Sequence, residues 1–302
     1  MNVGFIGVGR MGNPMARHLA GAGHQVAVYD SQPEAVSRLT SLEVVRPARG
    51  VADAADGAGV VLTSLPGPKE VEEVVLGPGG LIESMAPGAT YVDLSTNSPV
   101  LVRRLAAALA ERGIEMLDAP VSGGVEGAEA GTLSVMTGGK HEVFDRMQPL
   151  LGAIGTKLFY CGEAGAGCVV KLCNNICGAA YGVILGEALT LGVKAGVDLE
   201  TLTNVIGQST GSVSRLTGRF PRYLFARNFT PGFSAALSAK DTRLALDLAA
   251  QYNVPMAVGA AVGNELSEAL ARGWGDLDFD ATVRVQEERT GVVLALPASD
   301  KG

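Results

Sequence analysis

Residues 4–12 read GFIGVGRMG, in which Gly7, Gly9 and Gly12 follow the spacing G-x-G-x-x-G. In a chain with 41 glycines that match alone is weak. Here, however, it stands between a predicted strand (3–6) and a predicted helix (11–20), as a dinucleotide site requires. Gly7 allows the tight turn, Gly9 lets the backbone approach a pyrophosphate, and Gly12 lets the helix pack on the sheet. The segment therefore predicts a dinucleotide-binding turn, with an unliganded strand–turn–helix as the alternative.

The second predicted strand, over 25–29, leads directly into Asp30. A carboxylate at this place accepts hydrogen bonds from the adenosine ribose hydroxyls and repels a 2′-phosphate. Ser31 and Gln32 follow, rather than an arginine that would hold such a phosphate. Asp30 therefore predicts NAD in preference to NADP.

The first half of the chain alternates strand-like and helix-like segments, which predicts an α/β fold. We expect a Rossmann-type, doubly wound and mostly parallel sheet. A helix over 99–112 begins with a proline, which is favourable in a first turn. The remaining strands are expected at 60–65, 90–94, 115–118, 133–137 and 158–160.

The pattern changes after residue 162, where one long helix is predicted over 165–195 because no proline interrupts it. Gly178, Gly182 and Gly186 recur every four residues along it, which favours close helix–helix contact. Beyond it only helical segments are expected, so the second domain should be all-helical. The predicted parts are an NAD-binding domain (1–163), the long interdomain helix (164–195), a helical C-terminal domain (196–293) and a tail (294–302).

Composition narrows the possible classes of protein. The chain has 302 residues, 47% hydrophobic and 18% charged, with a formal net charge of −7. The acidic balance and the absence of a Lys/Arg run argue against nucleic-acid binding. We find neither a signal peptide nor an apolar run of ~18 residues, so we expect a cytoplasmic protein without membrane contact. The four cysteines form no CxxC pair and lie away from the three histidines, so we expect apolar fillers rather than a metal site.

Lys171 lies early on the predicted long helix, and Asn175 follows it by one helical turn on the same face. A cation and an amide within an apolar helix need polar partners, and clefts between domains are frequent ligand sites. A partly buried lysine can act as a base, because desolvation lowers its pKa from ~10.4. Lys171 is therefore a candidate for the group that takes the hydroxyl proton when an alcohol is oxidised, unless it is a solvated surface lysine.

Four motifs occur in one order, and together they resemble the β-hydroxyacid dehydrogenase family of 3-hydroxyisobutyrate dehydrogenase-like enzymes. The resemblance covers roughly residues 1–293. The four motifs are GFIGVGRMG (4–12), DAPVSGG (118–124), GAG (165–167) leading to Lys171 and Asn174-Asn175, and Lys240-Asp241.

The resemblance implies a role for each matching residue. Lys171 corresponds to the catalytic acid/base and Asn175 to the amide that holds the substrate oxygen. Ser122, Gly123, Gly124, Asn174 and Phe233 correspond to substrate-binding positions. The implied cofactor contacts are Gly7, Gly9, Arg10, Met11, Gly12, Asp30, Leu65, Pro66, Thr96 and Lys240.

The resemblance also implies a small carboxylate-bearing hydroxy acid or semialdehyde as substrate, and a homodimer or homotetramer assembled through the helical domain. Oxidation by NAD of a β-hydroxy acid is the leading hypothesis. A semialdehyde reductase acting on tartronate or succinic semialdehyde with NAD(P)H is the alternative with the same residues. An imine reductase and a catalytically silent dinucleotide-binding scaffold fit less well, because such relatives lack the lysine. A second carboxylate on the substrate could pair with Arg215, Arg219 or Arg222, each of which can equally be a surface residue.

Overall fold

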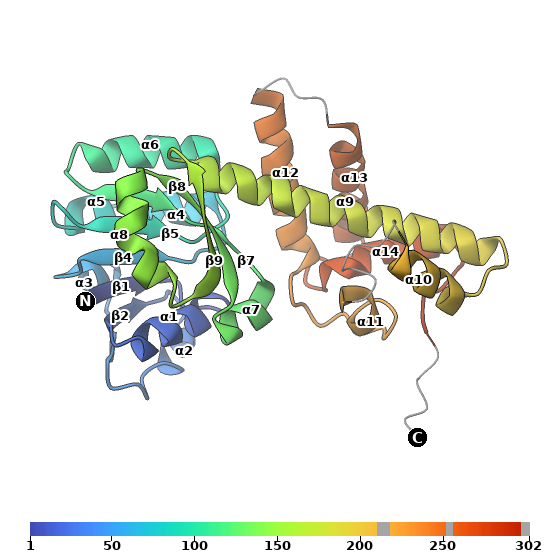
Figure 1. Cartoon of the computed structure of the whole chain (residues 1–302), viewed down its shortest axis with the longest axis horizontal. Helices are drawn as coiled ribbons and strands as arrows, with labels where there is room; N and C mark the ends of the chain where they lie inside the picture. Colours follow the sequence, from blue (N-terminus) through green and yellow to red (C-terminus); the bar gives the residue numbers. More distant parts are fainter. Residues whose placement is uncertain (210–217, 252–255, 297–302) are drawn as a thin grey trace. The chain divides into compact units, whose positions relative to one another are not determined.

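The computed structural model describes residues 1–209, 218–251 and 256–296 (Figure 1). The chain forms two compact units, Met1–Leu172 and Cys173–Gly302. The division falls inside the long helix rather than before it. Lys171 therefore belongs to the first unit, together with the sheet.

The first unit is built on a nine-stranded sheet. Six strands are parallel in the order β3-β2-β1-β4-β5-β6, which is the Rossmann order, and β8 pairs antiparallel with β6 and β7 and parallel with β9. The strands are β1 Asn2–Ile6, β2 Gln25–Tyr29, β3 Val45–Pro47, β4 Val60–Thr63, β5 Thr90–Asp93, β6 Glu115–Asp118, β7 Val121–Ser122, β8 Leu133–Gly139 and β9 Gly155–Gly162.

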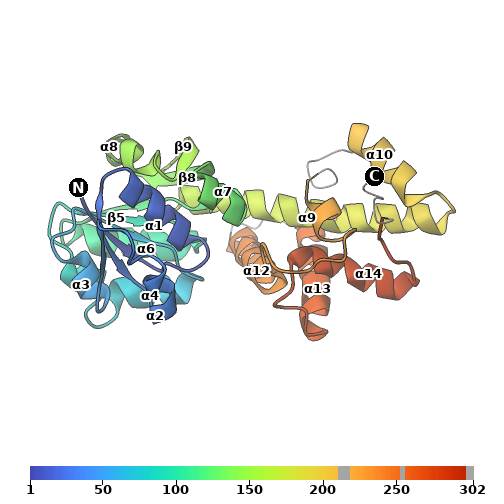
Figure 2. The ribbon, with the colours of Figure 1, turned by 90° about the horizontal axis from the view of Figure 1, so that it is seen from below.

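Helices cover both faces of this sheet (Figures 1 and 2). Alternate strand residues point to opposite faces, so that Phe5 joins one core cluster and Ile6 the other. One cluster contains α1 (Gly12–Gly21), α2 (Pro33–Ser37), α7 (Gly124–Ala130) and α8 (His141–Leu151). The other contains α3 (Val51–Ala55), α4 (Pro68–Leu76), α5 (Leu81–Ser84) and α6 (Pro99–Ala110). The doubly wound fold predicted from the sequence is confirmed.

The parallel strands place their carboxyl ends at one edge of the sheet. The strand order reverses at β1, whose two neighbours are β2 and β4. In sheets of this kind ligands bind at that switch point, beyond the carboxyl ends. The glycine loop after β1, Asp30 after β2 and the loops after β4 and β5 all lie at this edge.

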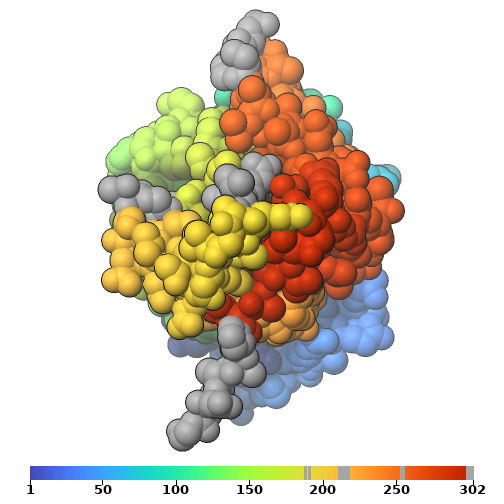
Figure 3. All heavy atoms as spheres, turned by 90° about the vertical axis from the view of Figure 1, so that its right-hand side faces the viewer, coloured from blue at the N-terminus to red at the C-terminus, as the bar shows by residue number. Residues whose placement is uncertain are grey.

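The second unit is helical in its described part. It contains most of α9 (Ala166–Lys194), then α10 (Leu199–Gln208), α11 (Phe220–Arg222), α12 (Ala235–Gln251), α13 (Ala257–Ala271), the short 3-10 helix η2 (Phe279–Thr282) and α14 (Val283–Thr290). Its core includes Leu185 and Leu189 of α9 with Phe220 and Phe225. In Figure 3 the yellow end of α9 lies beside α10 in gold and α14 in red.

The glycine spacing on α9 predicts close helix contacts, and the structure shows one at Gly186. A Cβ on Gly186 would lie 2.8 Å from a methyl group of Val283 in α14, so a side chain there would collide. A Cβ on Gly178 would meet no atom within 4 Å, and Gly178 is exposed. The prediction of close packing is therefore confirmed at Gly186, and at Gly178 it stays a prediction.

Two expectations drawn from composition are also corrected. Cys168 is buried, as an apolar filler should be, but Cys173 and Cys177 are exposed on α9. The stretch 166–186 of α9 has the length and the mean hydropathy, 1.5, of a membrane span, although no such run was expected. A single helix of this kind is weak evidence of a span, because core helices of folded domains share the same properties.

Candidate active site

The glycine loop has the geometry that a pyrophosphate needs. Gly7 has φ +87°, and a Cβ there would lie 2.4 Å from the carbonyl oxygen of Ser64. A Cβ on Gly12 would lie 1.9 Å from the carbonyl oxygen of Gly7, so the helix start fits against the turn only without a side chain. Gly9 instead faces open space.

Arg10 and Met11 lie directly before α1, whose first turn has no side-chain cap. The Asn13 N–H bonds the Gly9 carbonyl oxygen, and an uncapped helix start offers its remaining backbone N–H groups to an anion. The buried Nδ2 of Asn13, in the same turn, has no hydrogen-bond partner among the described residues. Open space before Gly9, an uncapped helix and an unpartnered buried donor together fit the phosphates of a dinucleotide.

Asp30 has a structural role besides the predicted one. Its Oδ2 accepts a hydrogen bond from the Val8 backbone N–H at 2.8 Å, and its Oδ1 accepts one from Gln32 N–H at 2.9 Å. The carboxylate thus ties the end of β2 to the glycine loop. It is still partly exposed, so a ribose hydroxyl could also reach it.

The loops after β4 and β5 place the other predicted cofactor contacts of the first unit. Leu65 is half-buried and Pro66 is exposed after β4, and Thr96 is half-buried after β5. All three follow strands that end at the edge of the glycine loop. The topology therefore brings them to the side of the sheet where the dinucleotide turn lies.

The Ser122–Gly124 loop connects β7 to α7. Gly123 has φ +140° and Gly124 φ +64°, conformations that side chains rarely adopt. The loop is accessible, and α7 packs against α1, where a ring nitrogen of His18 bonds the carbonyl oxygen of Glu129 at 2.9 Å. The predicted carboxylate-binding loop and the predicted pyrophosphate loop are thus joined through two packed helices.

Asp118, at the end of β6, holds the start of α9. Its Oδ1 accepts from Gly165 N–H at 2.7 Å and its Oδ2 from Cys168 N–H at 2.8 Å. Both oxygens are buried, and burial raises the pKa of Asp118 to about 6 although the two backbone bonds oppose that shift. Lys171 follows Cys168 by three residues, so this carboxylate fixes the turn that precedes it.

Asn175 lies one turn beyond Lys171 on α9, and its Nδ2 donates to Asp241 Oδ2 of α12 at 2.5 Å. Asp241 is buried, and its Oδ1 lies 2.9 Å from Lys240 Nζ. Asn174 is exposed, and its Nδ2 lies 3.4 Å from Asn175 Oδ1. Asp241 therefore sets the orientation of the Asn175 amide, whose oxygen faces Asn174 and whose second N–H is not used in the bond to Asp241.

Asp241 has a role in this site that its sequence context did not reveal. Its place beside Lys240 in a motif was visible, but its bond to Asn175 spans 66 residues. The cofactor contact of Lys240 and the substrate contact of Phe233 stay predictions. Phe233 is half-buried, its ring packs edge-on against Phe279, and its backbone N–H bonds Asp278.

Of the three arginines considered for a second carboxylate, Arg219 has acidic partners within its own unit. Its guanidinium bonds Asp278 at 2.6 Å and Asp280 at 3.1 Å, and both carboxylates are buried. Tyr223 and Phe279 lie against the same guanidinium. This makes a structural role the better explanation for Arg219, whereas Arg215 lies outside the described residues and Arg222 stays open.

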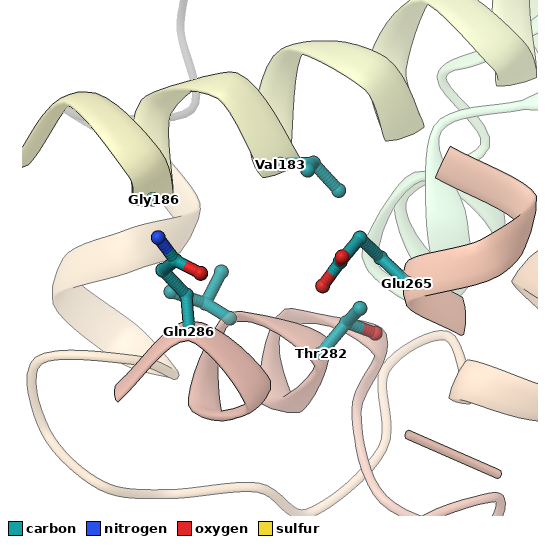
Figure 4. A pocket seen from close by; sticks show the side chains of 6 residues that line it. Val183, Gly186, Glu265, Thr282 and Gln286 are labelled. Atoms are coloured by element: carbon teal, nitrogen blue, oxygen red, sulfur yellow. The ribbon is translucent and has the colours of Figure 1, made fainter. Parts of the chain in front are cut away.

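A small hollow lies between α9, α13 and α14 in the helical unit (Figure 4). It contains Glu265 and Gln286, but Glu265 pairs with Arg289 at 2.6 Å. None of the predicted site residues lines it. Within the described ranges, no three His, Cys, Asp or Glu side chains come together as a metal site.

Comparison with known proteins agrees with this geometry. Residues 2–162 match the family described as the NAD binding domain of 6-phosphogluconate dehydrogenase. Residues 165–286 match the family described as NAD-binding of NADP-dependent 3-hydroxyisobutyrate dehydrogenase. The fold and the glycine site thus define a nicotinamide dinucleotide-binding dehydrogenase.

Similar proteins place the chain more narrowly. It is 37% identical to 2-(hydroxymethyl)glutarate dehydrogenase of Eubacterium barkeri, over 98% of both chains. It is 39% identical to 3-hydroxyisobutyrate dehydrogenase of Pseudomonas aeruginosa, over 88% of this chain and 91% of that one. The structure of Mycobacterium tuberculosis 3-hydroxyisobutyrate dehydrogenase with L-serine superposes with a TM-score of 0.86 at 34% identity, covering 94% and 98% of the two chains. The chain belongs to the β-hydroxyacid dehydrogenase family, of the 3-hydroxyisobutyrate dehydrogenase type.

The buried carboxylate of Asp118 makes stability depend on pH. Its pKa is about 6 in the folded chain against 3.8 as the reference value. The folded state therefore holds the proton more tightly than the unfolded state, and protonation of Asp118 stabilises the fold. This stabilisation is complete below the reference pKa of 3.8 and is lost as the pH rises through the folded-state pKa of about 6. The gap corresponds to about 3 kcal/mol. Urea unfolding measures the free energy of unfolding of wild type relative to that of Asp118→Asn. We expect this difference to increase by about that amount when the pH is lowered from about 7.5 to about 4.

A suitable control is Asp53→Asn. Hydrogen bonds from the Arg49 backbone and from Arg46 lower the pKa of Asp53, so its small contribution has the opposite sign. A wild-type advantage over Asp118→Asn that does not change with pH would contradict the assignment to Asp118.

Proposed function

We propose that this protein oxidises a small β-hydroxy acid to its semialdehyde with NAD, using Lys171 as general acid/base. The observation that carries the proposal is the place of Lys171. It lies one turn beyond the N–H groups that Asp118 holds, in the unit that contains the glycine loop. The reverse reduction of a semialdehyde uses the same groups.

The names of similar proteins support the substrate class. 2-(Hydroxymethyl)glutarate, 3-hydroxyisobutyrate and L-serine are substrates named for three of them. All three compounds carry a hydroxymethyl group on the carbon next to a carboxylate, so their alcohol is on the β carbon. The Ser122–Gly124 loop offers backbone N–H groups to that carboxylate, because successive glycines in such conformations form an anion-binding concavity.

The chemistry divides between the cofactor and the chain. When bound, the nicotinamide ring supplies the acceptor for the hydride that leaves the carbinol carbon. Lys171 Nζ takes the hydroxyl proton as the carbonyl forms, and returns it to the oxygen in the reverse direction. Asn175, whose N–H is engaged by Asp241, donates its remaining N–H to the substrate oxygen beside Lys171.

Asp30 supports NAD as the preferred cofactor, through repulsion of a 2′-phosphate. We propose further that the protein is cytoplasmic and forms a homodimer or homotetramer through its helical unit. Four free cysteines, two of them exposed, are typical of a reducing compartment. Exposed Cys173, Cys177 and Ile184 lie on one face of α9 at intervals of four and seven residues, as on helices that pack together.

Replacement of Lys171 tests the acid/base role. Lys171→Ala should lower kcat by about 10²–10⁴-fold, because the proton loses its acceptor, and leave cofactor affinity close to that of wild type. NADH absorbance with 3-hydroxyisobutyrate, L-serine, 2-(hydroxymethyl)glutarate and glycerate measures kcat, with 4-hydroxybutyrate as a control of different spacing. Near-normal turnover of Lys171→Ala on the best substrate would refute the assignment.

The cofactor preference is tested at Asp30. Asp30→Asn removes the charge but keeps an oxygen for the Val8 N–H, so the glycine loop should remain in place. We expect the ratio of kcat/KM for NAD to that for NADP to fall by about tenfold, or roughly 1.4 kcal/mol. Asp56→Asn, a loss of one acidic charge elsewhere in the same unit, should leave the ratio unchanged. An unchanged ratio in Asp30→Asn would remove Asp30 from the cofactor site.

Assembly is tested by light scattering. Wild type should have the mass of two or four chains, and Ile184→Glu on the exposed face of α9 should shift it toward one. Val258→Glu serves as a control, because Val258 is also an exposed apolar residue but lies on α13. A wild-type monomer at micromolar concentration would contradict the proposed oligomer.

A further inference from the structure

A buried carboxylate, Asp93, lies beneath the loops that follow β4 and β5. Its side chain is fully buried. Its Oδ1 accepts from the Thr63 hydroxyl at 2.9 Å and from Ser95 N–H at 3.0 Å, and its Oδ2 accepts from Asn97 Nδ2 at 2.8 Å. The chemistry proposed above uses none of these groups.

The contacts of Asp93 continue into both loops. The Ser95 hydroxyl oxygen accepts from Leu65 N–H at 2.9 Å, which ties the loop after β4 to the loop after β5. Asn97 Oδ1 accepts from Ser98 N–H at 2.7 Å, at the start of α6. Thr96 lies between two residues that are both bonded to the same carboxylate.

The number of protons that each hydroxyl and amide can donate fixes the directions of these bonds. The Thr63 hydroxyl has one proton and donates it to Asp93, so the hydroxyl of Tyr91, 2.8 Å away, must donate to Thr63. Asn97 uses its oxygen for Ser98 N–H and its amide N–H for Asp93. A network with a single consistent assignment holds its atoms in one arrangement.

A buried carboxylate of this kind is an unfavourable way to stabilise the fold, because its desolvation costs free energy. Burial raises the pKa of Asp93, and the bonds from Asn97, Ser95 and Thr63 only partly offset this. An apolar residue at this place in the strand would avoid the desolvation penalty. The carboxylate supplies a shared acceptor for the end of β4 and the loop after β5, which an apolar side chain cannot provide.

We propose that Asp93 is a positioning residue for the dinucleotide, which holds the loops carrying Leu65, Pro66 and Thr96 in the conformation that binds the cofactor. The inference rests on the proposed function, because it takes those loops to contact the cofactor. Asp93 itself touches neither substrate nor cofactor in this proposal and acts through Ser95 and Asn97.

An exchange of the two side chains tests the proposal. Asp93→Asn turns an N–H group toward Asn97 Nδ2, so that two donors oppose each other. The double variant Asp93→Asn/Asn97→Asp restores a donor–acceptor pair and keeps an oxygen for Ser98 N–H, with the net charge of wild type. We expect Asp93→Asn to raise the Kd of NADH by about tenfold, and the double variant to recover most of that loss, as measured by NADH fluorescence.

A control separates positioning from general destabilisation. Leu109→Ala removes a fully buried side chain of α6. Leu109 belongs to the core cluster that contains α3, α4, α5 and α6, rather than to these loops. At an equal loss of Tm it should leave the Kd of NADH near the wild-type value. If it weakens NADH binding as much as Asp93→Asn does, or if the exchange gives no recovery, the positioning role is refuted.

Two further variants keep the test decisive. If Asp93→Asn does not fold, Ser95→Ala takes its place: it removes the acceptor of Leu65 N–H and the side-chain bond from Ser95 to Asp93, and should raise the Kd several-fold. An unchanged value would refute the proposal. Gly9→Val tests the cofactor site itself, because a Cβ at Gly9 would lie in open space with no atom within 4 Å. Normal NADH binding by Gly9→Val would refute the proposed site, whereas lost binding there with unchanged binding in the Asp93 and Ser95 variants would refute this inference alone.

Discussion

The two hydrogen bonds from the backbone of α9 to Asp118 are the interaction on which the proposed chemistry depends. They join the last residue of a central strand to the first turn of the helix that carries Lys171. Close packing reinforces them, because a Cβ on Gly167 would lie 2.2 Å from the Met136 carbonyl oxygen, and one on Gly138 would lie 2.5 Å from Asp118 Oδ1. A carboxylate and two glycines thus fix the first turn of the helix that carries the lysine.

The same arrangement recurs along the carboxyl edge of the sheet. Asp30, Asp93 and Asp118 each end a parallel strand or directly follow one, and each accepts at least one backbone N–H from a loop or helix start. Strand ends are rigid and loop N–H groups need partners, so aspartate is well suited to join them. The strand-end aspartates thereby fix the loops, while the space in front of Gly9 stays open for a ligand.

The sequence is most informative where a function depends on local spacing. The glycine fingerprint, Asp30 and the long helix all follow from residues near one another in the chain, and their places were predicted correctly. The partners of Asp118 and of Asp241 were not, because those bonds span 47 and 66 residues. Gly178 shows a further limit. A four-residue spacing of glycines predicts which face of a helix lacks side chains, but not whether another helix of the same chain packs against that face.

Asp93 and Asp241 share a property that separates them from most buried residues of this chain. Each is a carboxylate out of contact with water that bonds an amide side chain, Asn97 in one case and Asn175 in the other. A carboxylate can only accept, so in each pair the amide must present its N–H to the carboxylate and turn its oxygen away. In the first pair that oxygen holds the start of α6, and in the second it accepts from Asn174. Because each carboxylate can only accept, it fixes which end of the amide faces it, a choice that packing alone cannot make because the two ends have nearly the same shape.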